Sequence, residues 1–169
     1  MKDNKEQFSQ IYDQYIEKIY RFVYLKVNSR ETAEDLTSKV FLKGWEAFQK
    51  PIDNPGAFLY RIARNIVVDH YREKGRTKIV STEAIPQVAD PGTGLHEKAV
   101  INADIELVKL AIQNIKKDYQ DVIIWHYLDD MPVPDIAKAM EKPEGTIRVM
   151  LHRGLKTLKE EMEKRIQES

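Results

Sequence analysis

The clearest hydrophobic pattern in the chain lies between residues 54 and 72, where two faces of opposite character recur with helical spacing. The apolar face consists of Leu59, Ile62, Ala63, Ile66, Val67 and His70. The opposite face is largely basic and polar and consists of Arg61, Arg64, Asn65, Val68 and Arg72. Because both sets repeat every three or four residues, the pattern predicts an amphipathic helix. Asn54 and Pro55 mark its start, since Asn caps orphan N–H groups and Pro suits the first helical position.

Two more amphipathic helices are predicted before this one. The first covers about residues 6–27, with an apolar face of Phe8, Ile11, Tyr12, Tyr15, Ile19, Phe22, Val23 and Val27. Asn28, with Glu31 three residues later, predicts a capping box at the start of the second helix, which runs to about residue 48. Its inward residues are Ala33, Leu36, Val40, Phe41, Trp45 and Phe48, and its outward stripe is Asp35, Ser38, Lys39 and Leu42. These three helices can close one compact bundle.

The helical pattern stops near residue 75 and resumes near residue 98. The stretch between contains Pro86, Pro91, Gly92 and Gly94 and no sustained periodicity. Such a composition is typical of a flexible linker. The sequence therefore predicts an all-α protein of two small helical domains, 1–75 and 98–169, joined by a linker over 76–97.

The second domain is predicted to end in a helix-turn-helix. An apolar stripe from Ile101 to Ile115 and a helix over about 119–128 come first. A short helix over 132–140, a turn at Glu141 and a long helix over 143–165 follow. Ala137 is small enough for the two helices to approach closely. The turn favours a left-handed backbone at Glu141, which costs a non-glycine residue about 1 kcal/mol.

The long last helix again has two faces. Its predicted inward residues are Ile147, Leu151, Leu155, Leu158 and Met162. Its predicted outward residues are Thr146, Arg148, Val149, His152, Arg153 and Lys156. In a helix-turn-helix the N-terminal half of this helix enters the major groove of DNA. With the basic face near residue 64, this gives two candidate nucleic-acid surfaces.

Charge is segregated along the chain although the formal net charge is +0. Basic residues dominate between 61 and 78, and acidic residues dominate between 83 and 135. A uniformly basic DNA-binding protein is thereby excluded, and any contact with DNA must use local surfaces. No apolar run reaches the ~20 residues of a membrane span, and the first residues show no secretory signal. We therefore expect a cytoplasmic protein with no membrane insertion of its own.

The residues that enzymes and metal sites require are scattered or missing. The chain has no cysteine, and so neither a disulfide nor a thiolate metal site. Its histidines lie far apart in sequence, at His70, His96, His126 and His152. No glycine-rich phosphate loop is present. We expect neither catalysis nor a cofactor nor a bound metal.

Three segments resemble one known family, the extracytoplasmic-function (ECF) group of bacterial sigma-70-type RNA polymerase sigma factors. Ala33–Trp45 is similar to the helix by which the family binds core polymerase. Phe58–Arg72 is similar to its −10 promoter helix, and Glu144–Lys156 to its −35 recognition helix. All three occur in the family's order and spacing, and with their flanking helices they span nearly the whole chain.

The resemblance implies a role for each predicted surface and a set of partners. Core RNA polymerase would bind Asp35, Ser38, Lys39 and Leu42 through its β′ clamp, and its β subunit is a further expected partner. The −10 element would bind Ile52, Asp53, Asn54, Arg61, Arg64, Asn65 and Arg72. The −35 element would bind Thr146, Arg148, Val149, His152, Arg153 and Lys156. Promoter DNA is thus a second partner, and an anti-sigma factor is a candidate third.

Some positions depart from the family pattern, and two other functions stay open. Ser38-Lys39 replaces the common Gln-Glu, Phe58 replaces a common Trp, and Val149-Met150 stand where Ser and Arg are frequent. A stand-alone helix-turn-helix regulator would explain the last helices but not Ala33–Trp45, and it would bind DNA as a dimer. A protein that binds only polymerase would leave Arg148 and Arg153 without a role.

Overall fold

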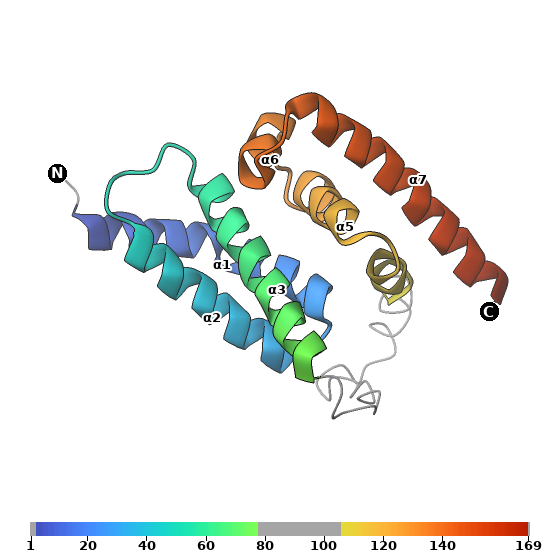
Figure 1. Ribbon diagram of the computed structural model, residues 1–169. Helices are drawn as coiled ribbons and strands as arrows, with labels where there is room; N and C mark the ends of the chain where they lie inside the picture. Colours follow the sequence, from blue (N-terminus) through green and yellow to red (C-terminus); the bar gives the residue numbers. More distant parts are fainter. Residues whose placement is uncertain (1–2, 78–105, 169) are drawn as a thin grey trace, which may run out of the picture.

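The computed structural model describes residues 3–77 and 106–168, and all regular secondary structure in these two ranges is helical (Figure 1). The predicted all-α class is confirmed. Residues 78–97 of the predicted linker lie outside the described residues, as do Ile101 and Ile105 of the predicted stripe. No helix in the described ranges is long and apolar enough to cross a membrane.

The N-terminal half is a bundle of three helices. They are α1 (Asn4–Val27), α2 (Arg30–Ala47) and α3 (Pro55–Thr77), and each packs against the other two. The fully or nearly fully buried side chains between them include Ile19, Phe22, Val23, Leu36, Val40, Leu59, Ala63 and Val67. Tyr12 and Trp45 were predicted to point inward, but each is 42% exposed at the rim. Tyr12 packs edgewise on Phe41, and Trp45 packs at a tilt on Phe8.

The junction between α1 and α2 corrects the predicted capping box. Asn28 ends α1 in the left-handed conformation, at φ 54°, and its N–H donates to the Tyr24 carbonyl. Ser29 is the N-cap of α2, where its Oγ accepts a hydrogen bond from Thr32 N–H at 3.3 Å. Asn tolerates the left-handed region better than most residues. The prediction was therefore one residue early, because Asn28 closes the first helix instead of opening the second.

The C-terminal half contains a helical stretch over 106–113 and four further elements. These are α5 (Lys117–Ile123), a π-helical continuation η1 (Ile124–Leu128), α6 (Val133–Met140) and α7 (Glu144–Glu168). Gly154 allows α7 to lie close to α5, since a Cβ there would stand 3.0 Å from Ile123 Cδ1 and 3.2 Å from Tyr119 Cβ. A larger side chain at Gly154 would push the two helices apart.

The helix-turn-helix consists of α6, the turn at Glu141 and α7. Glu141 has φ 57°, so the predicted left-handed turn is confirmed. The buried residues of α7 are Ile147, Met150, Leu151 and Gly154. Leu155, predicted to face inward, is 39% exposed, because Gly154 occupies the position nearest α5. Burial of Met150 places that departure from the family pattern in the core.

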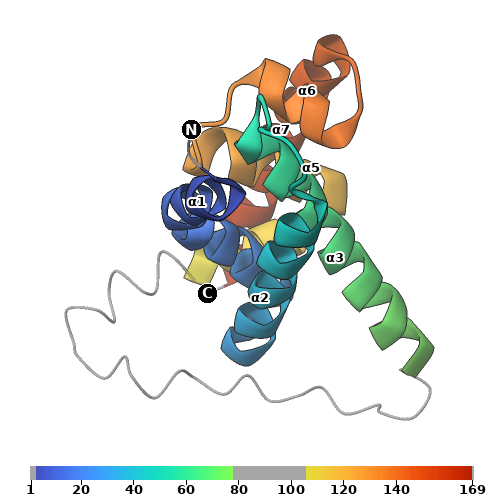
Figure 2. The same ribbon diagram turned by 90° about the vertical axis from the view of Figure 1, so that its left-hand side faces the viewer.

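The two halves pack on each other and share apolar contacts. Trp125 of η1 is fully buried, and its ring centroid lies 5.4 Å from those of both Phe22 and Tyr60 in the N-terminal bundle. Helix α6 packs against α3, and both views place it beside the N-terminal end of that helix (Figures 1 and 2). The interface therefore brings the C-terminal half onto the same helix that carries the predicted −10 surface.

Candidate polymerase and nucleic-acid interfaces

The predicted polymerase-binding residues form an exposed stripe on α2. We call this the α2 stripe, and it consists of Asp35, Ser38, Lys39 and Leu42, all exposed. Leu42 is 59% exposed, a high value for a leucine. Lys39 pairs with Asp35 along the helix at 3.4 Å, and Ser38 Oγ donates to the Glu34 carbonyl. An exposed apolar side chain among polar ones is typical of a protein-binding surface.

The predicted −35 residues also form one exposed surface. We call it the α7 face, and it consists of Thr146, Arg148, Val149, His152, Arg153 and Lys156, all exposed. Arg148 forms a 3.4 Å pair with Glu144 one turn earlier on the helix. Val149 is 47% exposed, which leaves its methyl groups accessible. This arrangement offers cations for phosphates and one apolar contact for a base edge such as a thymine methyl.

The short loop before α3 holds the first predicted −10 residues. Asn54 caps α3, with its Oδ1 accepting from Ala57 N–H at 3.0 Å. Its Nδ2 donates to Asp135 Oδ1 on α6 at 2.8 Å. Ile52 is half-buried and Asp53 is exposed. One of these three side chains therefore bonds to the C-terminal half.

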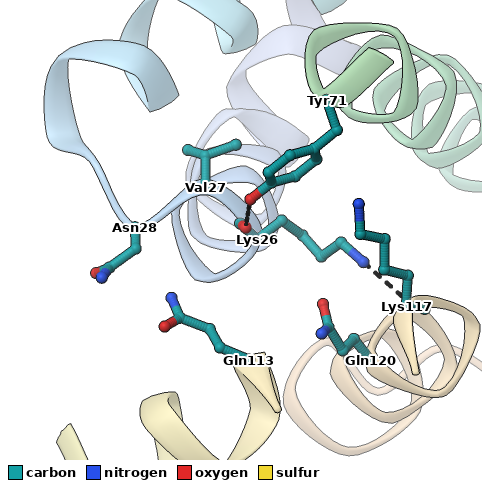
Figure 3. A pocket seen from close by; sticks show the side chains of 7 residues that line it. All are labelled: Lys26, Val27, Asn28, Tyr71, Gln113, Lys117 and Gln120. Carbon is teal, nitrogen blue, oxygen red and sulfur yellow. Dashed lines mark hydrogen bonds between the residues drawn. The ribbon is translucent and has the colours of Figure 1, made fainter. Parts of the chain in front are cut away.

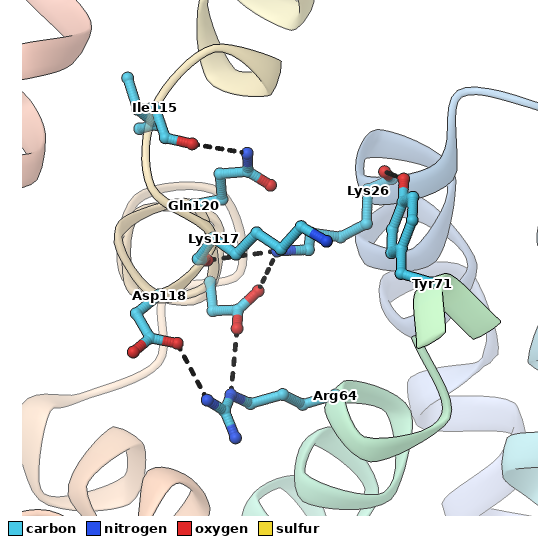
Figure 4. A network of polar contacts seen from close by, with 8 residues as sticks. Lys26, Arg64, Tyr71, Ile115, Lys117, Asp118 and Gln120 are labelled. Carbon is cyan, nitrogen blue, oxygen red and sulfur yellow. Dashed lines mark hydrogen bonds and ion pairs between the residues drawn. The ribbon is translucent and has the colours of Figure 1, made fainter. Parts of the chain in front are cut away.

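The arginines at the middle of the α3 basic face are engaged by acids of the C-terminal half. Arg64 Nη2 donates to Asp118 Oδ1 at 2.9 Å, and Arg64 Nε donates to Asp121 Oδ2 at 3.1 Å (Figure 4). Arg61 forms an ion pair with Glu141 in the helix-turn-helix turn. The residues that the sequence predicts to bind DNA thus have carboxylates as their partners here.

The rest of the α3 basic face is open. Asn65 and Arg72 are both exposed, and Arg72 lies 3.8 Å from Asp69 on its own helix. The structure therefore divides the predicted −10 residues into two groups. Asn54, Arg61 and Arg64 contact the C-terminal half, whereas the others have no interdomain bond among the described residues.

A buried ion pair lies directly behind Arg64. Lys26 Nζ stands 2.8 Å from Asp121 Oδ1, and both side chains are only 3% exposed. Lys26 Nζ also donates to the Lys117 carbonyl at 3.2 Å (Figure 4). Burial lowers the pKa of Lys26 and raises the pKa of Asp121, because removing either charge from water is costly. The attraction between the two groups offsets part of that cost.

Arg64 completes this network from the more open side. Burial acts to lower the pKa of Arg64, but the hydrogen bond that it donates to Asp118 and the charge of Asp121 outweigh that effect and raise it. Arg64 therefore remains a full cation between two carboxylates. A phosphate approaching α3 at this point would have to replace both of them.

A second polar contact between the halves involves Asp129, which is 5% exposed. Its Oδ2 accepts from the Tyr60 hydroxyl at 2.6 Å, and its Oδ1 pairs with Arg21. Arg21 also donates to the Leu128 carbonyl at 2.8 Å. Burial and the neighbouring Asp129 charge raise the pKa of Tyr60, which keeps the hydroxyl protonated as a donor.

The interface also contains a partly open pocket of about 320 Å³ (Figure 3). It is lined by Lys26, Val27, Asn28, Tyr71, Gln113, Lys117 and Gln120. Lys117 Nζ lies 3.9 Å from the centroid of the Tyr71 ring, and the Tyr71 hydroxyl donates to the Lys26 carbonyl. Nowhere in residues 3–77 and 106–168 do three His, Asp or Glu side chains gather as a metal site would require.

Sequence reasoning missed the residues that join the two halves. Lys26, Asp121, Trp125 and Asp129 were not predicted to form an interface, although all four are buried. Lys26 follows Leu25 on a predicted helix and reads as an ordinary solvated lysine. The only available signal was the acidic composition of the C-terminal half opposite a basic helix, which does not pair individual residues.

The fold and its exposed surfaces define a helical DNA-binding protein with a helix-turn-helix, and comparisons with known proteins give its family. Residues 11–77 match the family model described as Sigma-70 region 2, and residues 105–158 match the one described as Sigma-70, region 4. The chain is 29% identical over 154 residues to the ECF RNA polymerase sigma factor BldN of Streptomyces coelicolor, covering 89% of this chain and 58% of BldN. It is 26% identical over 172 residues to SigW of Bacillus subtilis, covering 95% and 91%.

Solved structures of related proteins share the fold. The sigma factor RpoE in complex with the anti-sigma factor NepR from Bartonella quintana matches with a TM-score of 0.73 at 21% identity, over 93% of this chain and 97% of RpoE. CnrH in complex with the cytosolic domain of CnrY matches with a TM-score of 0.64 at 15% identity, over 90% of this chain and 84% of CnrH. These likenesses concern the arrangement of helices.

The chain belongs to the ECF group of sigma-70-type RNA polymerase sigma factors. The family resemblance inferred from the three segments is confirmed. A stand-alone helix-turn-helix regulator is not favoured, because region 2 of the family accounts for residues 11–77 as well.

Proposed function

We propose that this protein is an alternative sigma subunit that binds core RNA polymerase and directs it to promoters. In this proposal the α2 stripe docks on the β′ clamp, and the C-terminal half contacts the β subunit. The α3 basic face and the loop Ile52–Asn54 bind the −10 element, and the α7 face binds the −35 element. The protein catalyses no reaction of its own and acts in the cytoplasm, where the polymerase is.

The observation that carries the proposal is that the proposed polymerase-binding surface and the proposed −35 surface are exposed on separate helices, α2 and α7. Every residue of the α2 stripe and of the α7 face is accessible to solvent. The α2 stripe has the mixed polar and apolar character of a protein-binding surface, whereas the α7 face carries the cations of a DNA-binding one. Two such surfaces on one chain allow it to bridge polymerase and promoter.

The test is co-elution with purified bacterial core RNA polymerase on a sizing column. The wild-type chain should form a stoichiometric complex, and Leu42→Asp should abolish it, because a charge would replace the exposed apolar contact. Val149→Asp is the matched control, since it adds the same charge to another exposed apolar residue, on the α7 face, which is 47% exposed against 59% for Leu42. It should still co-elute but should lose selection of −35 promoter DNA.

The opposite result would favour the stand-alone regulator. That protein would form no complex with core polymerase and would bind duplex DNA tightly as a dimer. Retention of polymerase binding by Leu42→Asp together with its loss in Val149→Asp would show that the two surfaces have been exchanged.

We also propose an anti-sigma factor as a physiological partner. The structures of RpoE and CnrH, which share the fold, were each solved in complex with another protein, and NepR is described as an anti-sigma factor. An anti-sigma factor that blocks initiation would have to cover the α2 stripe or the α7 face.

A further inference from the structure

The C-terminal half presents a set of carboxylates to the α3 basic face. We call this set the acidic face, and it consists of Asp118, Asp121, Asp135 and Glu141. They come from three places in the chain: α5, α6 and the turn before α7. All four contact residues that the proposed function assigns to the −10 element. Three predicted DNA-binding residues, Asn54, Arg61 and Arg64, each pair with a carboxylate here, and Arg64 pairs with two.

Carboxylates and DNA phosphates satisfy the same donors. An arginine binds either group through parallel N–H bonds, and an amide nitrogen donates to either oxygen type. Arg64 makes bonds of 2.9 and 3.1 Å to two carboxylates and is 26% exposed. Its fork cannot hold a phosphate while both carboxylates remain in place.

We infer that the acidic face of the C-terminal half is an intramolecular binding surface for the α3 basic face, which it occupies in competition with −10 DNA. This inference rests on the proposed −10 role of α3. In the closed arrangement of Figure 4 the free chain cannot bind the −10 element through Arg64. Binding to that element requires the two halves to separate.

The chemistry of the interface makes this separation reversible. The buried pair of Lys26 and Asp121 gains little net stability, because desolvation of two charges offsets much of their attraction. Its directional contacts instead favour one docked arrangement, with Arg64 in register. The apolar contact of Trp125 with Phe22 and Tyr60 supplies attraction without charge. Opening rehydrates the charges, which is favourable, and exposes Trp125, which is unfavourable. Binding to core polymerase and DNA therefore has to supply only the difference between these two free energies.

The experiment measures the separation of the halves and DNA binding in the same full-length chain. Because the protein has no cysteine, Ser9→Cys on α1 and Gln167→Cys on α7 give two exposed labelling sites for energy transfer. The test variant is Asp118→Asn combined with Asp121→Asn, which keeps side-chain shape and removes both charges facing Arg64. The DNA probe is a fluorescein-labelled single strand of random sequence, used at fixed salt because phosphate binding is salt-dependent.

We expect energy transfer to fall in this double variant and its affinity for the probe to rise at least about ten-fold, since the binding-competent form becomes the major one. Adding Arg64→Ala should cancel the gain in affinity. The matched control is Glu160→Gln with Glu163→Gln, which removes the same formal charge from exposed positions of α7. It should change neither quantity.

Each alternative result has a distinct meaning. Unchanged energy transfer in the double variant would overturn the inference, as would an equal affinity gain in the control. A fall in energy transfer with no gain in affinity would overturn the competition with DNA and the −10 role of α3, while leaving polymerase binding by α2 untouched. If circular dichroism shows that the double variant is unfolded, Asp135→Asn with Glu141→Gln tests the same surface at more exposed positions. There too, unchanged energy transfer would overturn the inference.

Discussion

Helices α3 and α7 present similar basic surfaces in sequence, but the structure treats them differently. On α7 all six predicted DNA-binding residues are exposed. On α3 the two central arginines are held by carboxylates from the other half of the chain. The α7 face lies on the far side of its helix from the residues that pack on α5 and α6. The α3 basic face lies partly within the interface between the halves.

This difference shows that the basic face of an amphipathic helix can be exposed to solvent or covered by another part of the chain. Periodicity identifies which side chains share a face, but it does not say what packs on that face. In α3 both faces have partners: the apolar one packs in the N-terminal bundle, and part of the basic one packs on the acidic face. We therefore expect perturbations of the interface to affect α3 and to leave the α7 face unchanged.

The largest expected effect comes from removing the aromatic contact that joins the halves. Trp125→Ala should lower the free energy of unfolding by about 3–5 kcal/mol, since it deletes a fully buried ring. Urea denaturation measures the loss. Trp125→Phe keeps a ring in place and should lose much less. The exposed Trp45 offers a second comparison, and an equal loss for Trp45→Ala would contradict a shared core between the halves.

An intermediate effect should separate the two basic surfaces directly. Arg153→Ala should weaken promoter binding by the polymerase complex by about 1–3 kcal/mol and leave energy transfer between the halves unchanged, because Arg153 is exposed. Arg64→Ala should weaken start-site opening, leave polymerase binding intact and lower energy transfer in the free chain.

Promoter-binding and energy-transfer measurements on Arg153→Ala and Arg64→Ala test these two predictions. Loss of polymerase binding in Arg64→Ala would show that the α3 basic face binds polymerase and not the −10 element. Unchanged transcription by Arg153→Ala from the cognate promoter would count against the α7 face as the recognition surface.

The smallest expected effect concerns the turn at Glu141, which leads into α7 and contacts α3. Glu141 adopts a left-handed backbone conformation, which is unfavourable for a non-glycine residue, and pairs with Arg61 across the interface. Both Glu141→Gly and Glu141→Gln remove the ion pair, but only glycine relieves the backbone. Urea denaturation should find Glu141→Gly more stable than Glu141→Gln by about 1 kcal/mol. Equal stability of the two variants would show that the turn is unstrained.

The sequence alone predicted most of the local structure because each of these features depends on near neighbours. Asn54 caps α3, Glu141 adopts the left-handed turn, and the α2 stripe and α7 face are exposed as their spacing predicts. The errors were local shifts at packed positions. Asn28 ends a helix instead of starting one, and Leu155 is exposed because Gly154 takes the place nearest α5.

What only the tertiary structure decided is which faces of the two halves meet. Lys26 and Asp121 are 95 residues apart in the chain, and Tyr60 and Trp125 are 65 apart, so no periodic pattern links them. Their pairing depends on the shape and charge of both surfaces together. Sequence determined the helices, the helix-turn-helix and the family, because these follow from short-range spacing and capping. Packing determined that part of the α3 basic face is covered, because long-range charge and aromatic contacts exist only once the halves have docked.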